Sequence, residues 1–120
     1  MRTLERGSSA ADVLAMARAT GHSRFPVVGE GVDDVIGMVH LRAAIAVAAH
    51  ERDATSVLSL MVDAPRVPET LSMRPLLVEL REHGHQCAIV VDEYGGTAGL
   101  VTLEDVVEEL VGDVAGEHDR

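Results

Sequence analysis

The chain has 120 residues, enough for one compact domain or for two repeats of about sixty residues each. Hydrophobic residues make up 47% of it and charged residues 25%, which is close to the globular average and argues against wholesale disorder. The formal net charge of −10 argues against a nucleic-acid-binding protein, because such proteins need a basic face. No run of eighteen apolar residues is present, so the sequence predicts no membrane-spanning helix in this chain.

The first half of the chain has the pattern helix, strand, strand, helix. Ser9 is the expected N-cap of a helix that ends at Gly21. Two strands are expected over residues 24–28 and 35–39, with a polar turn between them. A second helix is expected over residues 41–49, where apolar side chains recur at helical spacing.

The second half repeats this order. A helix is expected over residues 72–83 and ends at Gly84, and an apolar strand follows over residues 86–91. After an acidic turn, a strand is expected over residues 97–102 and an amphipathic helix over residues 103–111.

The spacing between equivalent residues indicates an internal duplication. Gly21 lies 63 residues before Gly84, and Gly37 lies 62 residues before Gly99, so the second turn is one residue shorter. The sequence therefore predicts an α+β fold with two helix–strand–strand–helix repeats related by a quasi-twofold axis. The expected domains are a first repeat at 1–52, a linker with the strand that leads into the second repeat at 53–70, a second repeat at 71–113, and the start of a linker to a C-terminal domain at 114–120.

Four segments carry a resemblance to a known family. They are GHSRFPVV (21–28), VIGMVHL (35–41), AIVVDEYGG (88–96) and GLVTLEDVVEELVGD (99–113), and together they resemble a tandem pair of CBS domains, also called a Bateman module. The DEYGG turn and the acidic helix after it resemble in particular the CorC/cyclin M family of magnesium and cobalt transport proteins, formerly called hemolysin-like.

This resemblance implies a regulatory module rather than an enzyme. It implies a position at the cytoplasmic face of the cell membrane, attachment to the transmembrane domain of a divalent-cation transporter or efflux protein, and a homodimer formed through the CBS pair. It also implies a short strand ahead of the first helix, for which only residues 1–4 are available.

Thr102 and Asp105 are the central candidate site residues, and two interpretations of them are open. In the first they form a capping box that stabilises the last helix by about 1 kcal/mol and implies no ligand. In the second the start of this helix faces a cleft between the repeats, where a helix N-terminus favours a phosphate. The resemblance implies that Asp105 binds ribose hydroxyls and Thr102 a phosphate oxygen of an adenosine nucleotide: ATP, ADP or AMP.

Arg24, Phe25 and Ile89 are further candidates for this site. Arg24 is either a solvated cation or a bidentate ligand of phosphate, and the resemblance favours the second role. Phe25 or Ile89 would form an apolar wall for the adenine.

A bound Mg²⁺ that bridges the phosphates is expected with the nucleotide, because residues 61–120 alone carry a net charge of −9. Glu104 and Glu108, one helical turn apart, are candidates for holding this ion through water, although a solvated acidic face is the simpler interpretation. No residues are predicted to bind a metal directly, since His22, His83 and His85 lack a ligand spacing.

The first repeat has His40 and Ala43 where the second has Thr102 and Asp105. Ala43 cannot hold a ribose, so one nucleotide per chain is expected. Cys87 lies in an apolar run and is predicted to be buried and inert.

No serine stands in a recognisable nucleophile–base arrangement, so no enzymatic activity is expected. The main hypothesis is a regulatory module that binds Mg-ATP and controls an attached magnesium or cobalt transporter. The alternatives are a dimerisation or interaction module without ligand, and a regulatory insert of a soluble enzyme.

Overall fold

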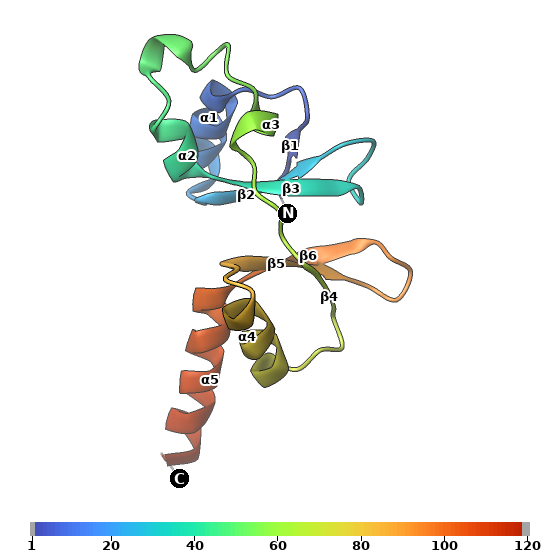
Figure 1. Ribbon diagram of the computed structural model, residues 1–120. Helices are drawn as coiled ribbons and strands as arrows, with labels where there is room; N and C mark the ends of the chain where they lie inside the picture. Colours follow the sequence, from blue (N-terminus) through green and yellow to red (C-terminus); the bar gives the residue numbers. More distant parts are fainter. Residues whose placement is uncertain (1, 119–120) are drawn as a thin grey trace. The chain divides into compact units, whose positions relative to one another are not determined.

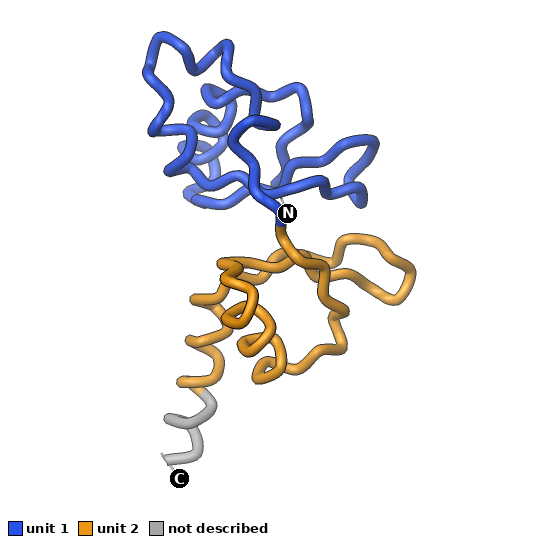
Figure 2. The backbone as a smooth tube through the Cα atoms, in the orientation of Figure 1, with its two compact units in different colours: residues 1–63 blue, residues 64–120 orange. Residues whose placement is uncertain are grey.

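A computed structural model describes the backbone of residues 2–118 and the side chains of residues 2–112. The protein is an α+β fold with two compact units, Met1–Asp63 and Ala64–Arg120 (Figures 1 and 2). The predicted fold class is thus confirmed. The boundary between the units falls inside the segment 53–70, which we assigned to the linker. Among the described residues, no helix combines the length and the apolar character needed to cross a membrane.

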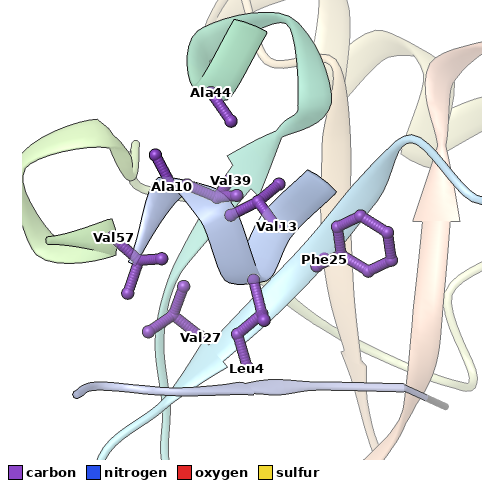
Figure 3. Packing of buried hydrophobic residues seen from close by; sticks show 8 residues of the cluster. All are labelled: Leu4, Ala10, Val13, Phe25, Val27, Val39, Ala44 and Val57. Carbon is purple, nitrogen blue, oxygen red and sulfur yellow. The ribbon is translucent and has the colours of Figure 1, made fainter. Parts of the chain in front are cut away.

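Unit 1 contains one three-stranded sheet with its helices on one face (Figure 3). Its strands are β1 (Leu4–Glu5), β2 (Arg24–Val28) and β3 (Val35–His40), and its helices are α1 (Ala10–Thr20), α2 (Leu41–Ile45), the 3₁₀ turn η1 (Ala49–Glu51) and α3 (Val57–Leu60). The sheet order is β1-β2-β3, with β1 parallel and β3 antiparallel to β2.

Helix α1 begins and ends where the sequence predicts. The Ser9 hydroxyl accepts a hydrogen bond from the Asp12 backbone N–H at 3.4 Å, and the Asp12 carboxylate accepts one from the Ser9 N–H at 2.8 Å. At the other end Gly21 has φ 76°, a left-handed conformation that a glycine adopts without strain.

Helix α2 is shorter than predicted, because it ends at Ile45 and not near Ala49. The Arg52 side chain explains the early end: its Nε donates to the Val47 carbonyl at 3.0 Å and its Nη2 to the Ile45 carbonyl at 3.1 Å. These carbonyls would otherwise lack partners at the helix end.

Replacing Arg52 by Met is expected to lower the free energy of unfolding by about 1–2 kcal/mol, since hydrogen bonds from a charged donor are lost at a half-buried position. Arg42→Met is the matched control, because Arg42 is exposed and its side chain forms no hydrogen bond or ion pair with the described residues. The control should stay within about 0.5 kcal/mol of the wild type in urea unfolding. Equal losses in both variants would mean that Arg52 does not cap α2.

Unit 2 repeats the arrangement of unit 1. Its elements are β4 (Arg66–Pro68), α4 (Met73–Glu82), β5 (Cys87–Val91), β6 (Thr97–Thr102) and α5 (Leu103–His118), and the sheet order is β4-β5-β6. Helix α5 runs beyond the predicted end at Val111 and through most of the segment 114–120 assigned to a linker. Gly112 does not adopt the left-handed conformation that would end the helix there.

The strand registers show that the two units are true structural repeats. In unit 1 Val27 lies opposite Gly37, and in unit 2 Val90 lies opposite Gly99. Each antiparallel pair contains a register shift at the same place, directly after Val27 and directly after Val90. The prediction of a duplicated unit with a turn shortened by one residue is therefore confirmed.

Each unit has its own hydrophobic core between its sheet and its helices. The core of unit 1 consists of eight buried side chains, shown in Figure 3: Leu4, Ala10, Val13, Phe25, Val27, Val39, Ala44 and Val57. The core of unit 2 is built from Val67, Leu76, Leu80, Ala88 and Val106. Because side chains alternate along a strand, Arg24 and His40 lie on the other face of the first sheet, and Ile89 and Thr102 on the other face of the second.

Candidate functional site

The junction of β6 and α5 holds the two central site residues. The Thr102 hydroxyl accepts a hydrogen bond from the Asp105 N–H at 3.1 Å, and the Asp105 Oδ2 accepts one from the Thr102 N–H at 3.4 Å. The capping box predicted from the sequence is therefore present. It depends only on residues three apart, which is why the sequence reveals it.

The capping bonds leave binding capacity at both side chains. Asp105 is exposed, and its second carboxylate oxygen takes no part in the cap. Thr102 uses its oxygen as an acceptor, so the hydroxyl proton remains available to donate. An exposed carboxylate acceptor next to a hydroxyl donor at the start of a helix suits a sugar hydroxyl and a phosphate oxygen, respectively.

The sheet of unit 2 places Thr102 on the same face as two other side chains. Cys87 lies directly opposite Thr102 in the register, and Ile89 lies opposite Leu100, two residues before Thr102. Cys87 is buried, as predicted. Ile89 lies on the face that carries Thr102 and has 2% of its surface exposed.

Glu104 and Glu108 lie on α5 one turn apart, and both are exposed. Their carboxylate oxygens are the ligand type that Mg²⁺ prefers. Across the described part of the chain, no group of three or more His, Cys, Asp or Glu side chains is placed to hold a metal ion. The protein alone thus offers two acidic oxygen donors, and a cation at this helix would need most of its ligands from phosphate and water.

Unit 1 has a different arrangement at the equivalent position. The His40 Nδ1 accepts a hydrogen bond from the Arg42 N–H at 2.9 Å, so an imidazole caps α2 where Thr102 caps α5. Ala43 stands in the place of Asp105 and has no polar side-chain atom. Arg24 begins β2 opposite His40 and is half-buried.

Phe25 does not lie with Arg24 on one face of the sheet. Its ring packs into the core of unit 1 beside Leu4 and Val13, and only 1% of its surface is exposed (Figure 3). The expectation that Phe25 forms a wall for adenine conflicts with this position, since the helices already cover the ring. The sequence RFPVV is apolar on both sides of the strand and did not reveal which side the helices cover.

One hollow was not anticipated from the sequence. It has a volume of about 330 Å³ and lies in unit 1, where the end of β1 meets the β2–β3 turn. Arg6 and Glu30 form a 3.8 Å ion pair at its rim, with both side chains mostly exposed. Its lining residues come together through the pairing of β1 with β2, and no local pattern marks them.

Among residues 2–112, whose side chains the structure describes, the histidines do not gather into a metal site. The rings of His83 and His85 stack with centroids 6.3 Å apart, and the His83 Nδ1 lies 3.0 Å from the Glu79 carbonyl oxygen. His83 is the C-cap residue of α4, so its ring lies against a carbonyl group of the last helical turn.

Comparison with known proteins identifies the class of this chain. The family model of the CBS domain matches residues 1–50 and again residues 56–112, so the chain belongs to the CBS domain family and contains two such domains in tandem. A CBS-domain pair from Klebsiella pneumoniae with bound AMP is similar, with a TM-score of 0.75 and 26% identity over 92% of this chain and 89% of that one.

The particular family is that of the CNNM/CorC Mg²⁺ transporters. The CBS domain of a bacterial member in complex with ATP has a TM-score of 0.87 and 42% identity, covering 93% of this chain and 80% of that chain. The magnesium and cobalt efflux protein CorC of Escherichia coli K12 is 34% identical over the whole chain, which spans 41% of its length. A UPF0053 protein of Mycobacterium tuberculosis is 44% identical over 116 residues, and the chain spans 26% of its length.

Proposed function

We propose that this chain binds one adenosine nucleotide, Mg-ATP, and that nucleotide binding regulates an attached transporter of divalent cations. The single observation that carries the proposal is the β6–α5 junction, where an exposed Asp105 and a Thr102 with a spare hydroxyl proton begin a long helix. The proposal is supported by the 42% identity to a CBS domain solved with ATP.

Each side chain has a distinct role in this proposal. The Asp105 carboxylate accepts hydrogen bonds from the ribose hydroxyls, and the Thr102 hydroxyl donates to a phosphate oxygen. Ile89 lies on the sheet face of Thr102, and we assign it to the apolar wall for the adenine. Arg24 supplies the guanidinium for the phosphates, because the chain from Asp92 to Asp119 contains no arginine or lysine.

Magnesium enters with the nucleotide for an electrostatic reason. Residues 61–120 carry a net charge of −9, and Glu104 and Glu108 stand on the helix that begins at the proposed phosphate position. A triphosphate brings further negative charge, which Mg²⁺ between its phosphates reduces. In this proposal Glu104 and Glu108 hold the Mg²⁺ ion through water molecules that are bound to it.

One site per chain is proposed, in the second repeat. His40 and Ala43 offer neither a carboxylate for ribose nor a hydroxyl for phosphate. The first repeat keeps the fold of a CBS domain and serves to complete the module.

Regulation requires that the nucleotide bind two arrangements of the module with different affinity. A homodimer at the cytoplasmic face of the membrane, joined to a transmembrane domain, would provide such arrangements. Exposed apolar side chains on α4 and α5, namely Val78, Val107 and Val111, support a role for these helices in association. The same side chains favour the second candidate function, an interaction module without ligand.

Calorimetric titration tests the proposal directly. ATP is expected to bind the 120-residue chain with a stoichiometry near one, and Mg²⁺ is expected to strengthen binding by roughly tenfold or more because it removes charge repulsion. AMP serves as the control, since it lacks the bridging phosphates and should respond little to Mg²⁺. A folded chain that releases no heat with any adenosine nucleotide would leave the interaction module as the function.

A further inference from the structure

The internal duplication allows the strand–helix junctions of the two units to be compared position by position. In each sheet the first residue of the central strand pairs with the last residue of the strand before the helix. Four positions correspond in this way: Arg24, His40, Arg42 and Ala43 in unit 1, and Cys87, Thr102, Glu104 and Asp105 in unit 2. Unit 1 has two arginines and no acid at these positions, whereas unit 2 has two acids and no arginine. The charge of the junction is therefore inverted between the repeats.

Basic side chains gather at this end of unit 1. The two segments that contain β2 and β3, residues 13–29 and 35–50, include neither Asp nor Glu, and their basic residues are Arg18, His22, Arg24, His40, Arg42 and His50. The acids of the β2–β3 turn lie at the other end of the sheet from α2 (Figure 1), separated from the junction by the length of β2, about 13 Å. Asp63 lies beside β3, but the antiparallel bridge between Val62 and Met38 directs it away from His40. The junction is thus a basic end of a protein whose net charge is −10.

The imidazole of His40 is held in place and keeps one donor. Its Nδ1 accepts the Arg42 backbone N–H at 2.9 Å, which requires that Nδ1 carries no proton. In the neutral ring the proton is then on Nε2, so this nitrogen can donate a hydrogen bond. His40 pairs with Arg24 across the sheet, which places the two Cβ atoms about 5 Å apart on the same face. A fixed N–H donor and a guanidinium group thus start from neighbouring positions.

Arg42 adds a second guanidinium group to the junction. It is exposed, and its side chain forms no hydrogen bond or ion pair with the described residues. Guanidinium groups bind oxyanions through two parallel hydrogen bonds, and an imidazole N–H adds a further donor. Ala43 provides no acceptor for the hydroxyl groups of a sugar. The side chains of this junction therefore suit a phosphate group and do not suit a nucleoside.

We propose that this end of unit 1 is a phosphate site, in which Arg24, His40 and Arg42 bind a phosphoryl group. The group has two chemical sources: the phosphate chain of the nucleotide proposed for the second repeat, or a separate inorganic phosphate. The first source rests on the proposed function, which already assigns Arg24 to the phosphates, and it adds His40 and Arg42 as further ligands of the phosphate chain. The second source does not depend on the nucleotide site.

Inorganic tripolyphosphate tests the site, because it has the phosphate chain of ATP and no nucleoside. In calorimetric titration at low ionic strength it should bind the 120-residue chain with a stoichiometry near one. Arg42→Met should weaken this binding roughly fivefold or more, since charge-assisted hydrogen bonds are lost. Arg6→Met is the matched control, because it removes an exposed arginine that follows β1 at the far end of the sheet, and it should change the affinity by less than about twofold. Equal losses in the two variants would show attraction by net charge alone and would overturn the site.

His40→Asp examines the imidazole separately. Aspartate is a good N-cap acceptor, so the start of α2 is preserved, while a negative charge replaces the donor beside Arg24. Tripolyphosphate binding should fall by roughly tenfold or more, because like charges now repel each other at short range. If His40→Asp and Arg42→Met both left tripolyphosphate binding unchanged, or if the wild-type chain bound none, the phosphate site would be refuted.

Competition with ATP identifies the source of the phosphoryl group. If saturating ATP blocks tripolyphosphate and Arg42→Met weakens both ligands alike, the group belongs to the nucleotide. If tripolyphosphate still binds the ATP-saturated chain and Arg42→Met leaves ATP affinity unchanged, the group is a separate phosphate. A failure of the proposed function gives a different result: ATP would bind no more tightly than tripolyphosphate, and Asp105→Ala would not change its affinity, while the effect of Arg42→Met on tripolyphosphate would remain.

Discussion

Replacing Asp105 by Ala is expected to weaken ATP binding by about 100-fold or more while the protein stays folded. The reason is that two hydrogen bonds from ribose hydroxyls to an ionised carboxylate are each worth about 1.5–3 kcal/mol. The same change removes the bond from the Thr102 N–H to Asp105 Oδ2 and should lower the stability of the protein by about 1 kcal/mol. Calorimetric titration with Mg-ATP and urea unfolding measure the two effects separately.

The first repeat supplies the control for this experiment. Asp12 forms a capping box with Ser9 at the start of α1, with the same pair of reciprocal bonds as Asp105 and Thr102. Asp12→Ala should therefore cost a similar amount of stability and leave ATP affinity unchanged. If the two variants lost ATP affinity equally, binding would depend on general stability, and the assignment of Asp105 to the ribose would be wrong.

Replacing Phe25 by Ala is expected to have the largest effect on stability, a loss of about 3–5 kcal/mol. Phe25 is the only phenylalanine of the chain, its ring is 1% exposed, and it packs among Leu4, Val13 and Val27 (Figure 3). Truncation to Ala leaves a cavity that this small aliphatic core cannot fill. Equilibrium unfolding measures the loss, and amide exchange should show it first in unit 1.

Phe25→Leu separates packing from ligand binding. Leucine preserves most of the apolar volume, so the variant should lose less than about 1.5 kcal/mol and keep its ATP affinity within roughly twofold. A strong loss of ATP affinity at nearly normal stability would show that Phe25 contacts the adenine after all.

Local features of the chain were predictable because their causes are local. The capping boxes at Ser9 and Thr102 involve residues three apart, and Gly21 ends α1 through its own backbone conformation. The duplication was visible because both repeats place the same glycine, Gly37 and Gly99, at the same point of the same strand. The strand β1 was expected on family resemblance, and the structure forms it from only two residues, Leu4–Glu5.

Other features depend on contacts between residues distant in the sequence. At the end of helix α2, Arg52 donates to the carbonyl of Ile45, the last helical residue, and to that of Val47 just beyond the helix. The role of Phe25 was decided by the strand register, which turned its ring toward the helices and Arg24 toward the opposite face of the sheet.

The sequence by itself thus determined the repeat, the fold class and the residues that begin helix α5, since helix caps, turns and apolar periodicity act over a few positions. The tertiary structure alone decided which face of each sheet the helices of its unit cover, because an apolar strand has the same composition on both sides. It also distinguished two glycines that look alike in the sequence. Gly37 lies against the backbone of Val62, whereas Gly99 has open space beside it, and that difference arises only from the path of the surrounding chain.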